Sequence, residues 1–299
     1  MEPRYIKTYQ SSELKKKISA LNKILASCTL CPRKCKINRI KGEKGFCQAG
    51  KDARVSSYFP HFGEEACLVG RNGSGTIFFS YCNLKCVFCQ NYEISHLAEG
   101  KDISKEELSD YMLALQNLGC HNINLVTPTH FAPQIVEALA LAIEKGLNLP
   151  LVYNCGGYES EEVIKILDGV IDIYMPDVKF ASREVAQKLC SGASDYFLHL
   201  KKVLKIMHQQ VGDLVIEDGI AQRGLLIRHL VMPNGLAETR EIMEFIATEI
   251  SLNSYINIMD QYRPCGEAAK FDEINRPITP AEFTEAVKIA QEFGLYRFA

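Results

Sequence analysis

The sequence predicts an α/β fold built from parallel βα units. Six strand-like runs alternate with helical stretches from about residue 76 onward, and this alternation favours a parallel sheet covered by helices. Crossover connections in such sheets are right-handed, so the units curl in one direction. Six strands are too few to close an eight-stranded barrel, and an open doubly wound sheet fits the alternation as well. The pattern alone therefore leaves two architectures open.

The expected strands are short apolar runs rich in β-branched and aromatic residues. They lie at 76–80, 122–126, 150–153, 171–175, 225–231 and 255–259. One expected helix begins at Ser104 with a capping-box glutamate, Glu107. A second ends against Gly146, a typical C-terminal residue of a helix. The other helical stretches lie at 161–168, 182–211, 237–250 and 280–293, and the second helix spans 132–145.

The N-terminal part reads as a separate unit. Residues 11–27 have helical apolar spacing, whereas 28–69 are rich in cysteine, glycine and charge, with little periodicity. We therefore expect an N-terminal helix plus a cysteine-rich metal-binding module over 1–69, followed by a core domain over 70–299.

The overall composition is that of an ordinary globular protein. The 299 residues are 47% hydrophobic and 23% charged, and the formal net charge is −2. This near-neutral charge does not indicate the basic surface that binding to nucleic acid or to an anionic membrane would need. No apolar run is long enough to cross a bilayer, and the N-terminus lacks the apolar core of a signal peptide. We expect a cytoplasmic protein.

Three cysteines, Cys82, Cys86 and Cys89, follow the first expected strand directly. Iron–sulfur cubes are normally held by four thiolates. A cube held by three keeps one iron open for another ligand, which indicates chemistry rather than a structural role. The alternatives are a four-thiolate zinc site and buried reduced cysteines.

A second group, Cys28, Cys31, Cys35 and Cys47, offers four thiolates in a glycine-containing loop. Four thiolates form a closed set, which suits structural zinc or an auxiliary [4Fe–4S] cluster. No residue decides between these two. Unligated thiols are the alternative, although a module with few apolar residues needs a cross-link, such as a bound metal, to fold.

The cysteine spacing also carries a resemblance. Cys-x3-Cys-x2-Cys with Phe88 before the last cysteine resembles the radical S-adenosylmethionine (SAM) superfamily. The string 75–91 is similar, more narrowly, to the branch of pyruvate formate-lyase activating enzyme, including its PflX-like members. The resemblance implies a partial (β/α)6 barrel, with the cluster loop after its first strand. Tyr81 stands at a position where this branch often has a small residue.

The resemblance implies that Cys82, Cys86 and Cys89 hold a [4Fe–4S] cluster whose fourth iron chelates SAM. Asp177 and Lys179 match an Asp-x-Lys motif that meets the methionyl end of SAM in the activating enzymes. The other implied cofactor contacts are Phe88, Arg228, Asn154, Thr127 and Thr129.

Departures from the activating enzymes limit the comparison. Thr127 and Thr129 belong to a Thr-Pro-Thr-His segment that stands in place of a Gly-Gly-Glu-type motif. Asn154 replaces an aspartate, and Arg263 replaces a histidine.

The function expected from this resemblance is reductive cleavage of SAM and hydrogen abstraction from a substrate. One form of this reaction is activation of a glycyl radical enzyme. The alternatives are a radical SAM enzyme that modifies a small molecule or peptide, and a non-catalytic iron–sulfur or zinc protein. The expected partners are an electron donor of the flavodoxin or ferredoxin type and, for an activase, a protein substrate. No nucleic acid or membrane partner is expected.

Overall fold

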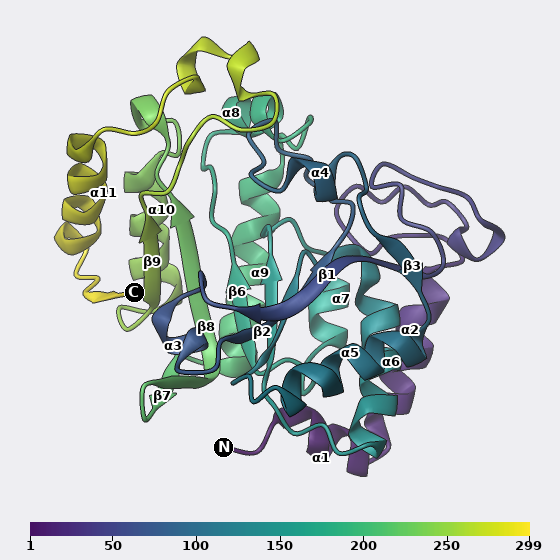
Figure 1. The fold of residues 1–299 in the computed structure, drawn as a ribbon. Helices are drawn as coiled ribbons and strands as arrows, with labels where there is room; N and C mark the ends of the chain where they lie inside the picture. The colour runs from purple at the N-terminus through teal and green to yellow at the C-terminus, as the bar shows by residue number, and fades with distance from the viewer.

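A large sheet forms the centre of the computed structural model, which describes residues 1–299 (Figure 1). Its parallel strands are neighbours in chain order. They are β2 (Ser74–Phe79), β4 (Ile123–Val126), β5 (Leu151–Cys155), β6 (Ile173–Pro176), β8 (Ile220–Leu230) and β9 (Tyr255–Met259). All six lie where the sequence predicts them. The sheet ends at β10 (Arg297–Phe298) and β3 (Lys101–Ile103) without closing. The predicted α/β fold with a partial barrel is confirmed.

The middle strands are buried on both faces. Every residue of β5 and of β6 is buried, as expected of parallel strands with a helical layer outside. The helices that follow the strands are α5 (Lys105–Asn117), α6 (Ala132–Glu144), α7 (Glu161–Ile166), α8 (Arg183–Leu189), α9 (Tyr196–Val211), α10 (Thr239–Phe245) and α11 (Pro280–Glu292).

Two predicted helical stretches are interrupted. The stretch 182–211 divides into α8 and α9 at a turn where Ser191 and Gly192 have φ angles of 49° and 80°. Residues with a left-handed backbone conformation cannot continue a right-handed helix. The stretch 237–250 starts as α10 and ends in a π-helical turn, Ile246–Ile250.

The helix ends follow the predicted chemistry. Ser104 and Glu107 form a capping box at the start of α5. Thr279 and Glu282 form another at the start of α11. Gly146, with φ of 95°, follows α6.

A strand that the sequence did not predict, β1 (Ala53–His61), pairs antiparallel with β2. The sequence does not indicate this strand because Ser56, Ser57 and Pro60 interrupt the alternation of apolar and polar residues. A bulge also shifts its register. From β1 the chain crosses the concave face of the sheet to α3 (Ala66–Val69), which contacts β8 (Figure 1). β1 thus lies within the expected N-terminal module, and the expected division at residue 69 stays a prediction.

Helix α3 fills the lower part of the barrel interior. Cys67 and Leu68 pack there against Val152, Met175 and Leu226 from three strands. The upper part, at the carboxyl ends of the strands, is left for a cavity.

Two N-terminal helices, α1 (Arg4–Gln10) and α2 (Glu13–Ile24), pack on the outside of α6 (Figure 1). Asp172 anchors this layer because one of its oxygens accepts the Arg4 amide at 2.7 Å and the other accepts the Leu151 amide at 2.9 Å. Only the second helix was predicted.

The remaining elements are short. They are α4 (Tyr92–Ser95), β7 (Val215–Glu217), and the 3-10 turns Arg39–Lys41, Thr129–Phe131, Pro233–Gly235, Ala268–Lys270 and Asp272–Ile274. None of the helices combines the length and the apolar character that crossing a bilayer requires.

We predict that Thr279→Ala lowers the free energy of unfolding by about 1 kcal/mol, because the amide of Glu282 loses its capping hydroxyl. Urea unfolding measures this change. Thr284→Ala is the control on the same helix, since the exposed Thr284 hydroxyl only bonds back to Pro280. An equal loss in both variants would contradict the assigned cap.

Candidate cluster and cofactor site

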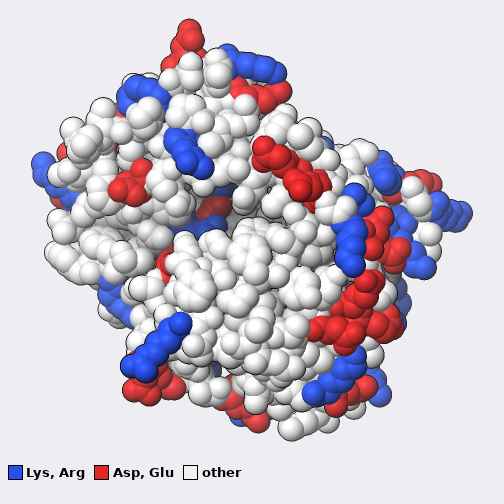
Figure 2. Space-filling view, in the orientation of Figure 1, with Lys and Arg blue, Asp and Glu red and all other residues white.

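The loop that carries Cys82, Cys86 and Cys89 leaves the carboxyl end of β2 and lines a cavity of about 180 Å³. Parallel strands bring their carboxyl ends to the same edge. Most of the predicted cofactor contacts therefore meet here: Phe88, Thr127, Asn154, Asp177, Lys179 and Arg228 also line the cavity. Figure 2 shows charged atoms of both signs at the bottom of a hollow whose rim is mostly uncharged.

Thr129 is the one predicted contact that the structure does not bring to the cavity. Its hydroxyl donates to the Glu159 carboxylate at 2.7 Å inside the core. The 3-10 turn Thr129–Phe131 carries this side chain away from the strand ends. Tyr81, the departure noted beside the first cysteine, does not line the cavity either.

The thiols already receive hydrogen bonds. The Leu84 amide donates to Cys82 Sγ at 3.3 Å, and the Ser95 hydroxyl donates to Cys89 Sγ at 3.2 Å. Burial, together with neighbouring thiols, raises the pKa of Cys82 to about 12. The thiol is thus neutral until a metal replaces its proton.

The arrangement of Cys82, Cys86 and Cys89 around one cavity indicates which metal group they could hold. In a cube, each thiolate binds a different iron, so the thiolates surround the cluster rather than converge on one atom. Three thiols around one cavity, two of them with donors to sulfur, fit an iron–sulfur cluster with one open iron.

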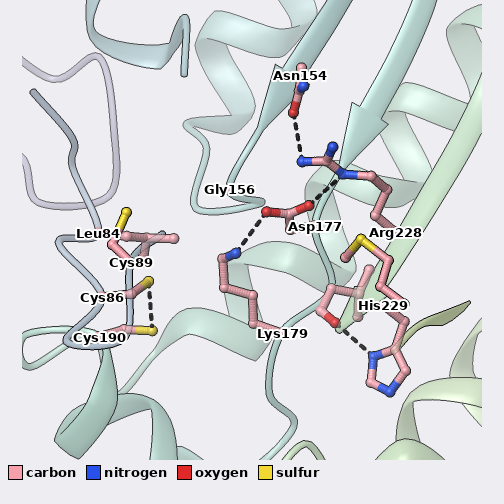
Figure 3. Close-up of polar contacts among 12 residues, drawn as sticks. Leu84, Cys86, Cys89, Asn154, Gly156, Asp177, Lys179, Cys190, Arg228 and His229 are labelled. Atoms are coloured by element: carbon pink, nitrogen blue, oxygen red, sulfur yellow. Dashed lines mark hydrogen bonds and ion pairs between the residues drawn. The ribbon is translucent and has the colours of Figure 1, made fainter. Parts of the chain in front are cut away.

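A buried ion-pair network lies across the cavity (Figure 3). Asp177 accepts from Lys179 Nζ at 2.7 Å and from Arg228 Nε at 2.8 Å. Arg228 also donates to Asn154 Oδ1 at 2.9 Å. Burial raises the pKa of Asp177, but Arg228 and Lys179 outweigh this and lower it to about 2. The carboxylate stays ionised.

The sequence did not predict several residues that lie in this site or contact it. Glu64 lies with its carboxylate 3.5 Å from Arg228 Nη1, although it follows β1 in a segment without a motif. Ser95 comes from the short helix α4. Cys190 belongs to no motif in the sequence, yet its sulfur lies 3.4 Å from that of Cys86 (Figure 3). Only the three-dimensional fold brings these residues together.

The second cysteine group lies apart from this cavity and lines a void of its own. A small enclosed void of about 10 Å³ is lined by Cys28, Cys31, Cys35, Cys47, Phe46 and His130, among others. The Phe46 amide donates to Cys35 Sγ at 3.5 Å. His130 is a core residue whose Nε2 lies 2.8 Å from the Ser80 carbonyl oxygen. Burial lowers the pKa of His130 to about 3, so its ring is neutral.

The model of the radical SAM superfamily matches residues 76–246, more than half of the chain. The chain belongs to the radical SAM superfamily. The matched segment runs from the first parallel strand, through the three-cysteine loop, to α10. Membership implies a [4Fe–4S] cluster and SAM as cofactors.

Relatives of this radical SAM protein occur in Methanocaldococcus jannaschii. The uncharacterized protein MJ0674 is 35% identical over 93% of this chain and 78% of its own length. The uncharacterized protein MJ0808 is 24% identical over 60% of this chain and 56% of its own. These relatives leave the substrate open.

Two solved structures align more distantly. A domain of pyruvate-formate lyase-activating enzyme from Bacteroides vulgatus aligns with a TM-score of 0.37 at 14% identity, over 65% of this chain and 89% of that chain. TYW1 with a lysine-pyruvate adduct bound aligns with a TM-score of 0.46 at 13% identity, over 73% of each chain.

We predict that Asp177→Asn destabilises the protein by about 3–5 kcal/mol, because Lys179 and Arg228 stay buried without their carboxylate. Thermal and urea unfolding measure this loss. The pKa of Asp177 is lowered in the folded state, so the ionised carboxylate stabilises the protein at every pH above the pKa of an unfolded aspartate. This stabilisation disappears only as the pH falls toward 2. The destabilisation by Asp177→Asn should therefore be constant between about pH 5 and 8.

The control is Asp102→Asn, which removes an exposed ion pair with Arg54. It should cost under about 1 kcal/mol. A comparable cost for both variants would contradict the assigned network.

Proposed function

We propose that this radical SAM protein is an enzyme that binds a [4Fe–4S] cluster through Cys82, Cys86 and Cys89 and abstracts a hydrogen atom from a substrate. The observation that carries the proposal is the shared cavity, which joins the three thiols to a buried charged network. When bound, the cluster supplies the electron that cleaves SAM reductively to methionine and a 5′-deoxyadenosyl radical. The chain's residues bind and orient SAM and exclude water.

Lys179 is the cation best placed for the carboxylate of SAM. An ammonium group has three donors, and Asp177 takes one of those of Lys179. Arg228 is more fully engaged, because it meets Asp177, Asn154 and Glu64. Each Asp177 oxygen keeps a further lone pair that can accept the SAM amine.

Aromatic side chains shield the same cavity. Phe88 lies between the rings of Phe180 and Tyr262, with centroids 5.8 and 6.0 Å away. Phe88 is buried, and both it and Tyr262 line the cavity. This apolar wall would keep water from a radical.

The substrate follows less directly. The similarity of the 75–91 string to activating enzymes supports hydrogen abstraction from a backbone glycine of a partner protein. The changed Thr-Pro-Thr-His segment and the exposed Arg263 favour a different substrate, such as a small molecule or a peptide. A flavodoxin or ferredoxin type donor would supply the electron in either case.

The N-terminal cysteines Cys28, Cys31, Cys35 and Cys47 would hold a second metal centre, either zinc or an auxiliary [4Fe–4S] cluster. Their shared enclosed void supports this part of the proposal. Iron, sulfide and zinc contents decide between the two metals.

Anaerobic reconstitution followed by SAM and a strong reductant should release 5′-deoxyadenosine. We predict that Cys86→Ala loses this product and the iron of one cluster. Cys120→Ala, which alters a buried cysteine outside the cavity, should keep both. Product formation by Cys86→Ala, or none by a fully loaded wild type, would refute the enzyme and favour a non-catalytic iron–sulfur or zinc protein.

We predict that Lys179→Gln keeps the iron content but weakens SAM binding at least tenfold, about 1.4 kcal/mol, because a donor to the carboxylate is lost. Equilibrium binding of SAM to the loaded enzyme measures this change. Lys188→Gln removes a lysine from an exposed pair with Glu273 and should bind SAM normally. Equal binding by both variants would remove Lys179 from the SAM site.

The substrate question needs a separate measurement. A glycyl radical doublet in the EPR spectrum of a candidate partner, formed only with SAM and reductant, would identify an activase. Label transfer from a deuterated small molecule or peptide into 5′-deoxyadenosine would identify the other class.

A further inference from the structure

The segment Leu189–Ser191 lies along the cluster loop. The Val87 amide donates to the Leu189 carbonyl at 3.0 Å, and the Ser191 hydroxyl donates to the Lys85 carbonyl at 2.7 Å. Between these bonds, Cys190 is fully buried against Cys86 (Figure 3). The end of α8 is thus fastened to the loop that carries the three thiols.

One guanidinium holds both segments from outside. Arg33 donates from Nε to the Asn83 carbonyl at 3.1 Å, which lies between Cys82 and Cys86 in the sequence. Its two terminal nitrogens donate to the carbonyls of Ser191 at 2.9 Å and Cys190 at 3.1 Å. Arg33 therefore cross-links the cluster loop to the end of α8.

The N-terminal cysteine group fixes the position of Arg33. In the sequence, Arg33 lies between Cys31 and Cys35. Its guanidinium carbon lies 3.8 Å from the centre of the Phe46 ring, and Phe46 directly precedes Cys47. A planar guanidinium can stack on a ring and still donate in its own plane to three carbonyls, whereas the compact ammonium of a lysine has no plane to stack.

We propose that Arg33 is a positioning residue that couples the two cysteine groups. Metal binding at Cys28, Cys31, Cys35 and Cys47 would fix Arg33, and Arg33 would hold the Cys190 thiol against Cys86. This inference rests on the proposed function for the identity of the two metal centres.

The direction of the contact between Cys86 and Cys190 follows from ligation. As a cluster ligand, Cys86 is a thiolate and can only accept a hydrogen bond. Cys190 must then donate its S–H. Hydrogen bonds to cluster sulfurs influence the reduction potential, so the clamp would affect the cluster as well as the fold.

The test compares Arg33→Lys with Arg297→Lys in the full chain, both reconstituted anaerobically. Arg297 is a matched control because it also donates to two carbonyls, Asn253 and Leu214, beside the ring of Tyr255. It lies at β10, away from both cysteine groups. Metal content, the EPR spectrum of the reduced cluster, and the rate of Cys190 alkylation by N-ethylmaleimide are measured.

Arg33→Lys should keep the N-terminal metal, alter the EPR spectrum and raise the alkylation rate of Cys190 at least tenfold. Arg297→Lys should match the wild type in all three measurements. Unchanged alkylation and an unchanged spectrum in Arg33→Lys would overturn the coupling.

Two further variants separate the parts of the proposal. Cys31→Ala should lose the N-terminal metal and reproduce the faster alkylation of Cys190. Cys190→Ala should shift the reduction potential of the cluster to more negative values, because a donor to the thiolate is lost. Cys190→Ser, which supplies another donor, should return the reduction potential most of the way to the wild-type value. Failure of the proposed function would appear differently, as a wild type without iron at Cys82, Cys86 and Cys89.

Discussion

The cavity depends on one buried carboxylate. Asp177 holds Lys179 and Arg228 within hydrogen-bonding distance, and Arg228 reaches on to Asn154. Two cations in a buried layer need such a partner, since an uncompensated buried charge is costly. The carboxylate also orders donors and acceptors where strand ends meet, which is the geometry that a zwitterionic cofactor requires. Under the proposed function, stability and cofactor binding would therefore depend on the same ion pairs.

The cluster loop has no regular structure of its own, so its shape comes from its neighbours. The end of α8 bonds to Lys85 and Val87, and Arg33 bonds to Asn83. Long loops that carry function are commonly held by a rigid scaffold. In this molecule part of that scaffold is Arg33 of the N-terminal cysteine group, so a segment outside the family match contacts the cluster loop.

Much of the fold followed from local patterns. The six parallel strands are apolar runs, and the caps at Ser104 and Thr279 are local hydrogen-bonding motifs, so the sequence shows them directly. The strand β1 lacked such a pattern because two serines and Pro60 interrupt its alternation, and its pairing with β2 shows it to be a strand. The contacts at the strand ends were found through the family motif, and all but Thr129 meet in one cavity.

The sequence was enough to predict the residues expected to carry the chemistry: three closely spaced cysteines, and polar residues that match a family motif directly after strands. Such features are local, and the parallel arrangement brings them to one edge. The three-dimensional structure was needed to show that Cys190 contacts Cys86, Glu64 contacts Arg228 and Arg33 contacts Asn83. These residues approach through contacts between distant segments, and no local spacing records a contact of that kind.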